Sequence, residues 1–374
     1  MQLIERDSDL PNLIATLSKS ARFFLDTEFE STRGGTTLCL IQVSDGRSVY
    51  LVDALRLSDL TSLGQVLGGS DKEWVLHAAQ QDVPLLQESL GLTQVPRLLD
   101  TQVAWACCSA EASVSLAYLE MVLLGVKRGK GHQRDDWKRR PLPQSQLAYA
   151  AEDVANLPAL YEQLRKRLDE SARLDVAYAA SREVFQLDSD PPRPLRLADF
   201  RNAWQLGPAE QAALLYLIDW FGALSDQNKT RAPDTKTLLS IAARMPRNAR
   251  DLGRIKGVSQ RFAERAGAQL CAALNKAAAA ADADVFEPIP PPPYATFDEI
   301  RRDAWLSFAR AEICAELGVA PELLLPPRLL KTLRAIWDDT GNFEAAVQAL
   351  RGFRRDLLGR ALLEFAKGHP PPSS

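Results

Sequence analysis

The sequence predicts an α/β domain, built on a mixed sheet flanked by helices, followed by two all-helical domains. Three strand-like runs follow one another near the N-terminus, and strands then alternate with helices, which is the pattern of a sheet covered by helices. Beyond about residue 195 the apolar residues recur at helical spacing.

The expected strands lie in the runs "RFFLDTEF", "LCLIQVSD", "SVYLVD" and "EWVLHA", with one more short strand at "RLLD" before Thr101. Short polar or glycine-bearing stretches separate the first three runs, which are close enough to form a meander of hairpins. After Trp74 the pattern becomes mainly helical.

Two proline-rich stretches set the expected domain boundaries. The segments "DSDPPRP" (188–194) and "FEPIPPPPYA" (286–295) cannot continue a helix or a central strand, because proline lacks the backbone N–H. Consecutive prolines favour an extended spacer. We therefore expect domains over residues 1–188, 195–283 and 294–368.

The helical part of the chain repeats itself. A shift of 95 residues places the "KTL" of Lys236–Leu238 on that of Lys331–Leu333, and Gly257 on Gly352, without a gap. A repeat of this kind indicates two structural units of one type.

Composition limits the class of protein. The hydrophobic share of 46% and the charged share of 25% are those of a folded globular chain. The sequence has no uncharged apolar window of membrane-spanning length, and its first residues are too charged for a signal peptide, so we expect a cytoplasmic protein without membrane contact. No heptad pattern or long apolar surface stripe favours an oligomer, so a monomer is expected. The five cysteines form no C-x-x-C pair, which argues against disulfides and zinc; we expect them reduced and mostly buried.

The net charge of −3 does not indicate a nucleic-acid-binding protein, but local charge does. The segment 127–140 holds seven basic and two acidic residues, and a second cluster between Arg244 and Lys256 holds five basic residues against Asp251. Both clusters could contact phosphate groups. A solvated charged surface is the alternative for each.

Two carboxylates interrupt a strand in "ARFFLDTEFES" (21–31). Side chains alternate along a strand, so Asp26 and Glu28 share one face. Neighbouring buried carboxylates repel each other unless a cation neutralises them, which points to a divalent metal. The alternative is that one carboxylate caps a turn and the other faces solvent.

Further residues of the same character follow along the chain. Asp82 begins an amphipathic helix, and Tyr149 and Asp153 are spaced i, i+4 on one helical face. Taken singly, Asp82 could be a first-turn carboxylate and Tyr149 a core aromatic. Four carboxylates together suit Mg²⁺ or Mn²⁺ rather than zinc. Two such ions about 4 Å apart can activate a water and stabilise the leaving oxygen in phosphodiester cleavage, with Tyr149 orienting or helping to deprotonate the water.

The motifs "FLDTEF", "HAAQQD", "LLDTQVAW" and "YAAEDV" resemble the three exonuclease motifs of the DEDD superfamily, in its tyrosine-bearing branch, and are most similar to the ribonuclease D family. The stretches "DDWKRRPL" and "RNAWQL" also resemble that family, and its C-terminal half carries two HRDC domains, so the resemblance covers nearly the full chain. It implies a ribonuclease H-like fold, and 3′-to-5′ hydrolysis of RNA that releases nucleoside 5′-monophosphates. Precursor tRNA 3′ ends are the substrates it implies. Carried over position by position, the metal ligands are Asp26, Glu28, Asp82 and Asp153, and the catalytic tyrosine is Tyr149.

Three other polar residues are expected to lie outside the metal site. His77 precedes Asp82 by five residues, a spacing found in the histidine branch of the superfamily, but there the histidine belongs to the last motif. His77 is therefore expected to be a hydrogen-bonding group at a strand end. Asp100 is expected to cap the following helix, and Asp53 to be a turn residue.

One departure from the family follows the first motif. Ribonuclease D members commonly have tyrosines and a proline there, whereas this chain has "ESTRGGTTLCL" with Gly34 and Gly35. Aromatic stacking contributes roughly 1–3 kcal/mol per base, so the grip on a terminal base is expected to differ. Alternatively, the glycines could make a mobile loop that closes over the RNA end.

Two other functions use the same residues. A DNA 3′-to-5′ exonuclease would need the same five side chains, and a catalytically inactive RNA-binding scaffold would share the fold. A pseudoenzyme usually lacks a ligand, and none is missing here. HRDC domains bind nucleic acid in some proteins and other proteins elsewhere, so the sequence leaves open which copy contacts RNA.

Overall fold

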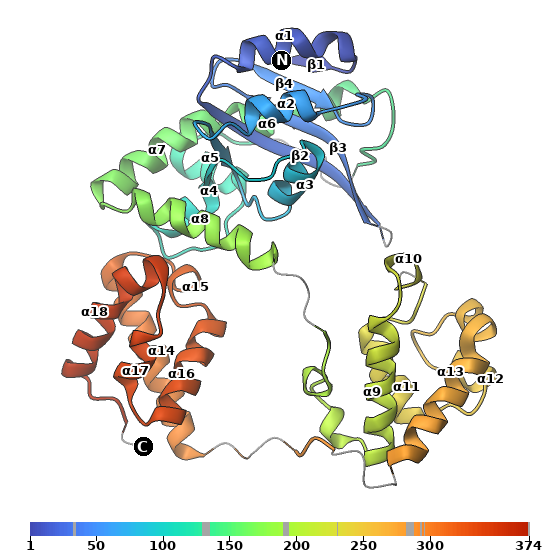
Figure 1. Ribbon diagram of the computed structural model, residues 1–374. Coiled ribbons are helices and arrows are strands. Elements are labelled where there is room, and N and C mark those ends of the chain that lie inside the picture. Colours follow the sequence, from blue (N-terminus) through green and yellow to red (C-terminus); the bar gives the residue numbers. More distant parts are fainter. Residues whose placement is uncertain are drawn as a thin grey trace. The chain divides into compact units, whose positions relative to one another are not determined.

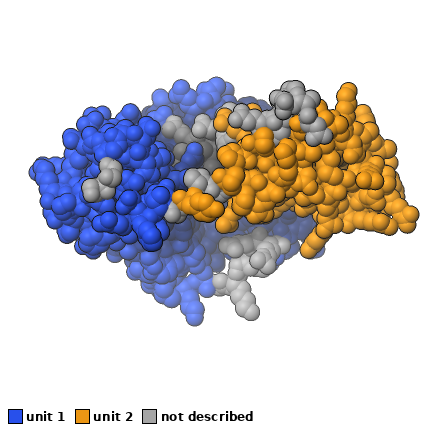
Figure 2. All heavy atoms as spheres, turned by 90° about the horizontal axis from the view of Figure 1, so that it is seen from below, with its two compact units in different colours: residues 1–30, 36–190, 296–374 blue, residues 31–35, 191–295 orange. Residues whose placement is uncertain are grey.

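The computed structural model describes residues 1–32, 35–128, 135–189, 194–229, 231–281, 288–291, 294 and 296–372 (Figure 1). The chain divides into two compact units, coloured in Figure 2. The first contains residues 1–30, 36–190 and 296–374, and the second contains residues 31–35 and 191–295.

The α/β region of the first unit is built on a mixed sheet. Within the described residues it has six strands in the order β1-β4-β3-β2-β5-β6. The pairs β1–β4, β2–β5 and β5–β6 are parallel, and β3–β4 is antiparallel. The strands are β1 (Gln2–Ile4), β2 (Arg22–Thr32), β3 (Gly35–Ser44), β4 (Val49–Asp53), β5 (Glu73–Leu76) and β6 (Arg97–Asp100). The five predicted strands are confirmed, whereas β1 was missed because three residues carry too short an alternation to be recognised.

Helices cover both faces of this sheet, which confirms the predicted fold class (Figure 1). Phe23 and Leu25 face a core shared with α1, α2 and α3, whereas Phe24 faces the opposite core, where its ring contacts Tyr161 of α7. The helices are η1 (Asp7–Asp9), α1 (Leu10–Leu17), α2 (Thr61–Leu67), α3 (Asp82–Ser89), α4 (Thr101–Ala106), α5 (Leu116–Leu124), α6 (Gln144–Ala155), α7 (Leu157–Glu170) and α8 (Leu174–Ser189).

The described part of residues 191–295, which makes up most of the second unit, is helical. Its helices are η2 (Leu197–Asp199), η3 (Ala203–Gln205), α9 (Pro208–Gly222), α10 (Asp226–Lys229), α11 (Thr235–Arg244), α12 (Ala249–Gly253) and α13 (Gln260–Ala280). Apolar residues of α9, α11, α12 and α13 meet in one core, for example Leu217, Ile241 and Leu270. Asp234 and Ser259 cap α11 and α13 with their side chains, so each helix begins where a good N-cap residue stands.

The C-terminal helices follow the same order of long and short elements. They are α14 (Phe297–Leu317), α15 (Pro321–Leu324), α16 (Pro327–Thr340), α17 (Phe343–Gln348) and α18 (Gly352–Gly368). This region packs on the α/β region and shares one apolar core with α4, α5, α7 and α8. The amide of Ala320 donates to the carbonyl of Ala106 at 2.8 Å, and Arg354 forms an ion pair with Glu183. The expected boundaries 1–188, 195–283 and 294–368 stay predictions.

Two expectations about the whole chain can be compared with the structure. All five cysteines are free, and four are buried while Cys108 is partly exposed. Among the described residues, none of the helices combines the length and the apolar composition that crossing a bilayer requires.

Candidate metal centre and active site

Strand β2 positions the first two carboxylates. It pairs with β5 through Arg22, Phe23 and Phe24, and β2 then continues to Thr32. Asp26 and Glu28 lie on this continuation, on the same face of the strand as Phe24. Their carboxylates therefore lie just past the carboxyl end of β5, an edge where α/β proteins commonly place their sites.

Helix α6 brings the third carboxylate to the same place. Oxygen atoms of Asp26, Glu28 and Asp153 lie within 4.8 Å of one another. Asp153 is only 6% exposed, and it lies on the face of α6 that turns toward the sheet, near the buried Ala150 and Val154. Three acidic groups from two elements thus converge on one point.

Asp82 stands beside this cluster rather than within it. It is the first residue of α3, as expected, and is 8% exposed. Its Oδ1 accepts a hydrogen bond from the hydroxyl of Thr27. Thr27 faces the side of β2 that is opposite to Asp26 and Glu28 and is covered by α3, so this bond holds Asp82 next to the pair.

The four carboxylates disturb one another electrostatically. Burial, followed by the charges of Asp82, Asp153 and Glu28, raises the pKa of Asp26 well above its usual range. Burial and the charges of Asp153 and Asp82 raise the pKa of Glu28 to about 9. Burial raises the pKa of Asp82 and of Asp153 to about 6 each. A cation would relieve this repulsion and favour the ionised forms.

Tyr149 lies one turn before Asp153 on α6 and is half-buried. Its ring packs against that of Trp137, with 6.4 Å between the ring centroids. Because residues at i and i+4 share a helix face, the tyrosine lies on the side of α6 that carries Asp153. Helix α6 thus carries the predicted catalytic tyrosine and one predicted metal ligand on a single face.

A half-buried arginine, which the sequence analysis did not predict, joins the site. Arg128 forms ion pairs with Asp153 and with Glu120, which is 0% exposed. Its Nη2 donates to Glu120 Oε1 at 2.8 Å and to the carbonyl of Glu152 at 2.8 Å. Asn156 also donates to Glu120 Oε1, at 3.2 Å. The signal was a lone glutamate in the apolar run "LAYLEMVLL", which needs a buried partner.

The residues expected outside the metal site do have other roles. His77 follows β5 and its ring contacts the Thr101 hydroxyl at 2.9 Å and the Val114 carbonyl at 3.0 Å, which confirms a hydrogen-bonding role at the strand end. Asp100 caps α4 by accepting from the amide of Gln102, as predicted. Asp53 accepts from the amide of Leu55, as a turn residue does, but it also forms a buried ion pair with Arg140 that was not foreseen.

Two sequence features fall wholly or partly outside the described residues. The first is the loop "ESTRGGTTLCL", in which the chain differs from the family: its Gly34 lies outside the described residues. Gly35 begins β3 with φ of 128°, a conformation that favours glycine. Residues 129–134 of the basic segment 127–140 are also outside the described part of the chain.

Known proteins resemble both halves of this chain. A family model described as 3′-5′ exonuclease matches residues 1–169, and one described as HRDC domain matches residues 233–274. Ribonuclease D of Pseudomonas paraeruginosa is 30% identical, over 97% of this chain and 96% of its own length. The chain belongs to the ribonuclease D family. Ribonuclease D of Granulibacter bethesdensis is 32% identical, over 98% of this chain and 92% of its own.

A solved structure agrees with this assignment. Escherichia coli RNase D, described as an exoribonuclease involved in structured RNA processing, matches with a TM-score of 0.79 at 26% identity, over 99% of both chains. The predicted family and fold class are therefore confirmed, with one HRDC domain matched. As a ribonuclease D, the chain is a hydrolase with 3′-to-5′ exoribonuclease activity.

Members of this exonuclease family use divalent metals, and the described side chains fit such an ion. The cluster offers carboxylate oxygens only, the ligands preferred by Mg²⁺ and Mn²⁺. Asp82 and Asp153 are buried, Asp26 and Glu28 are half-buried, and all four acidic groups resist ionisation without a counter-charge. Since water solvates these carboxylates poorly, a cation would gain from binding here.

Proposed function

We propose that this exoribonuclease removes nucleotides one at a time from RNA 3′ ends by two-metal-ion hydrolysis, with Mg²⁺ or Mn²⁺ held by Asp26, Glu28, Asp82 and Asp153. The observation that carries the proposal is the convergence of Asp26, Glu28 and Asp153 oxygens within 4.8 Å, with Asp82 beside them. The products would be nucleoside 5′-monophosphates.

The roles of the side chains follow from their positions. The bound ions would supply charge that activates a water and stabilises the leaving 3′ oxygen. Asp26 and Glu28, from one rigid strand, would set the position of the ions, and Asp153 and Asp82 would close the site from α6 and α3. Because β2 lies inside the sheet, its two carboxylates would move little on binding.

Tyr149 would orient the attacking water or help to deprotonate it. Its position one helical turn from Asp153 supports this role, because a group there can reach a water held near the same ion. The packing of its ring against Trp137 would fix the direction of the hydroxyl group.

Precursor tRNA 3′ ends are the substrates we propose. The full-length similarity to ribonuclease D supports this choice, as does the description of the Escherichia coli enzyme as acting in structured RNA processing. A cytoplasmic monomer with HRDC domains over 195–283 and 294–368 completes the proposal. The repeated helix order and the 95-residue sequence repeat support the second of these domains.

The test is release of mononucleotides from a labelled single-stranded RNA, with Mg²⁺ or Mn²⁺ and with a chelator. Asp153→Asn should lower the rate by at least about 10³-fold, since it removes a metal ligand. Glu152→Gln is the matched control: it removes an exposed carboxylate from the adjacent position and should retain the rate within about twofold.

Two results would contradict the proposal. Release of mononucleotides in the presence of the chelator would exclude a metal mechanism, and equal loss of rate in both variants would exclude a specific role of Asp153. A matched DNA oligomer, run in parallel, measures the preference for RNA.

A further inference from the structure

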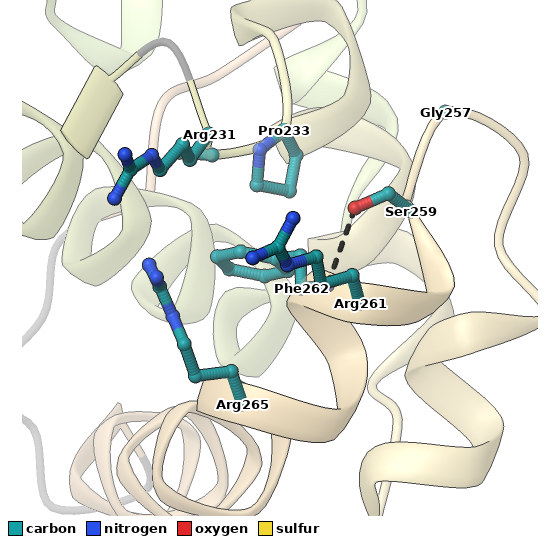
Figure 3. A pocket seen from close by; sticks show the side chains of 8 residues that line it. Arg231, Pro233, Gly257, Ser259, Arg261, Phe262 and Arg265 are labelled. Atoms are coloured by element: carbon teal, nitrogen blue, oxygen red, sulfur yellow. Dashed lines mark hydrogen bonds between the residues drawn. The ribbon is translucent and has the colours of Figure 1, made fainter. Parts of the chain in front are cut away.

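The second unit contains a pocket lined by arginines, far along the sequence from the carboxylate cluster. Its volume is about 310 Å³, and it lies between the segment Arg231–Pro233, which leads into α11, and the N-terminal turn of α13 (Figure 3). Arg231 enters from the first of these elements, and Arg261 and Arg265 enter from α13. Among the described residues that line the pocket, none is acidic.

In the described part of the structure, no acidic side chain neutralises the three arginines. Among the described residues, none of their guanidinium groups has an ion pair or a side-chain hydrogen bond, whereas Arg254, nearby in sequence, pairs with Asp251 at 3.7 Å. Figure 3 shows Arg231 and Arg265 reaching toward the same space, with Arg261 extending beside Phe262. Three like charges around one cavity repel each other unless an anion binds among them.

The rest of the pocket suits a phosphate ester. Pro233 and Phe262 form a buried apolar wall, and Ser259 caps α13 by accepting from the amide of Phe262 at 3.2 Å. The positive end of the dipole of this 21-residue helix points toward the same place. Guanidinium groups bind phosphate oxygens in a two-pronged manner, while an apolar wall accommodates the sugar.

The C-terminal helical region lacks this arrangement. At the positions 95 residues later, Pro326 stands for Arg231 and Asp356 for Arg261, and Arg360, which stands for Arg265, pairs with Glu364 at 2.7 Å. Arg354, which stands for Ser259, pairs with Glu183 of α8 and binds the carbonyls of Leu323 and Leu324. The surface that carries unpaired arginines in the second unit therefore serves, in the C-terminal helical region, to attach that region to the α/β region.

We propose that Arg231, Arg261 and Arg265 form a binding site for the backbone phosphates of RNA, and that the second unit holds the body of the substrate while its 3′ end is cleaved. The inference rests on the proposed function for the choice of RNA as the ligand. Contacts to phosphate are independent of sequence, which suits an enzyme that shortens different RNA 3′ ends. The C-terminal region, in contrast, has a structural role in attachment.

The experiment measures binding without cleavage. Fluorescence anisotropy of a 12-nucleotide single-stranded RNA is recorded with the full chain in chelator. The pocket variant combines Arg231→Gln, Arg261→Gln and Arg265→Gln. The control variant combines Arg165→Gln, Arg301→Gln and Arg360→Gln, which removes three accessible arginines that are already paired with carboxylates.

The pocket variant should bind the RNA at least about tenfold more weakly, and the slope of log K against log salt should fall by about 2. The control variant should stay within about threefold of the unmodified chain. Equal losses in both variants would mean that net charge decides binding, and would overturn the proposal. Circular dichroism and urea midpoints show that both variants fold.

Titrations with 5′-AMP and with inorganic phosphate separate an RNA backbone site from a site for the mononucleotide product. Millimolar binding of both supports the backbone site, whereas micromolar binding of 5′-AMP that is lost in the pocket variant would overturn it.

Turnover measurements separate this inference from the proposed function. The pocket variant should raise KM and retain kcat, whereas Asp153→Asn should lose kcat and retain RNA affinity. Suppose that the unmodified chain releases no nucleotides with either Mg²⁺ or Mn²⁺ while the two triple variants still differ in RNA affinity. In that case the proposed function fails and the pocket assignment stands.

Discussion

Arg128 forms an ion pair with Asp153, the carboxylate that α6 contributes to the proposed metal site. The same guanidinium group is bound to Glu120, which has no exposed surface. One positive charge therefore already neutralises part of the acidic cluster, and a metal ion at Asp153 has to share this carboxylate with an arginine.

We predict that Arg128→Gln binds Mn²⁺ at least about threefold more tightly in the absence of RNA, because a like charge next to the ion is removed. The same change should lower the free energy of unfolding in chelator by about 3 kcal/mol, since it leaves the buried Glu120 without its counter-charge. Titration calorimetry measures the first quantity, and urea unfolding measures the second.

The control for Arg128 is the double variant Glu120→Gln with Arg128→Gln. It removes both buried charges, and the side-chain amide introduced at position 120 can still accept the hydrogen bond from Asn156. Most of the lost stability should return, while Mn²⁺ affinity stays raised. An unchanged Mn²⁺ dissociation constant in Arg128→Gln would show that the ion pair does not compete with the metal.

The sequence predicts the carboxylates of the site well but not their surroundings. Asp26, Glu28 and Asp153 interrupt apolar patterns, so their chemistry is visible in single segments, and the structure does bring them together. Glu120 and Arg128 are separated by a helix end, and only the three-dimensional path of the chain makes them partners of Asp153.

The packing of the C-terminal region is a second example. Proline-rich stretches predict where helices and strands stop, and the stretch at 286–295 predicts a domain boundary. They do not predict what the following helices pack against, and in the structure Leu306 and Ile313 of α14 share one apolar core with the α/β region. Apolar periodicity shows that a helix has a buried face, but it cannot show which element covers that face.

Tyr149→Phe tests the role of the phenol. We predict that kcat falls by about 10²-fold, the usual contribution of a positioned proton-transfer group, while Mn²⁺ affinity stays within about twofold. The ring contact with Trp137 is retained in the variant, so stability should change little. Single-turnover kinetics with a labelled RNA measure the effect. A large loss of metal affinity would instead make Tyr149 part of the metal site.

The raised pKa values of the carboxyl groups predict how stability depends on pH. Glu28 keeps its proton to about pH 9 in the folded, metal-free chain, and Asp82 and Asp153 keep theirs to about pH 6, whereas unfolded carboxyl groups ionise near pH 4. In that interval the folded state binds more protons than the unfolded state, so stability falls as the pH rises. In chelator, the melting temperature should therefore decrease between pH 6 and pH 9.

Metal should reverse this trend, because it binds the ionised carboxylates. An ion at 100 times its dissociation constant stabilises the folded chain by about 2.7 kcal/mol. The melting temperature with Mn²⁺ should therefore exceed that with chelator, and the difference should increase toward high pH. Glu28→Gln cannot ionise at this position and should flatten the chelator curve between pH 7 and pH 9. If the melting temperature changed with pH in the same way with and without metal, the proposed carboxylate site would be contradicted.

Arg354 and Glu183 should couple the C-terminal region to the α/β region. Both side chains are largely covered, with 13% and 33% exposed, and Arg354 also donates to the carbonyl of Leu323 at 2.8 Å. We predict that Arg354→Gln lowers the free energy of unfolding by about 2 kcal/mol, and that a double-mutant cycle with Glu183→Gln gives a coupling energy of about 1 kcal/mol. Urea unfolding of the unmodified chain, the two single variants and the double variant measures these quantities.

The affinity of Arg354→Gln for RNA in chelator should stay within about twofold of that of the unmodified chain, because this arginine is engaged within the first unit. Additive effects would mean that the ion pair contributes nothing to the attachment, and a tenfold loss of RNA affinity would transfer RNA binding to the C-terminal copy.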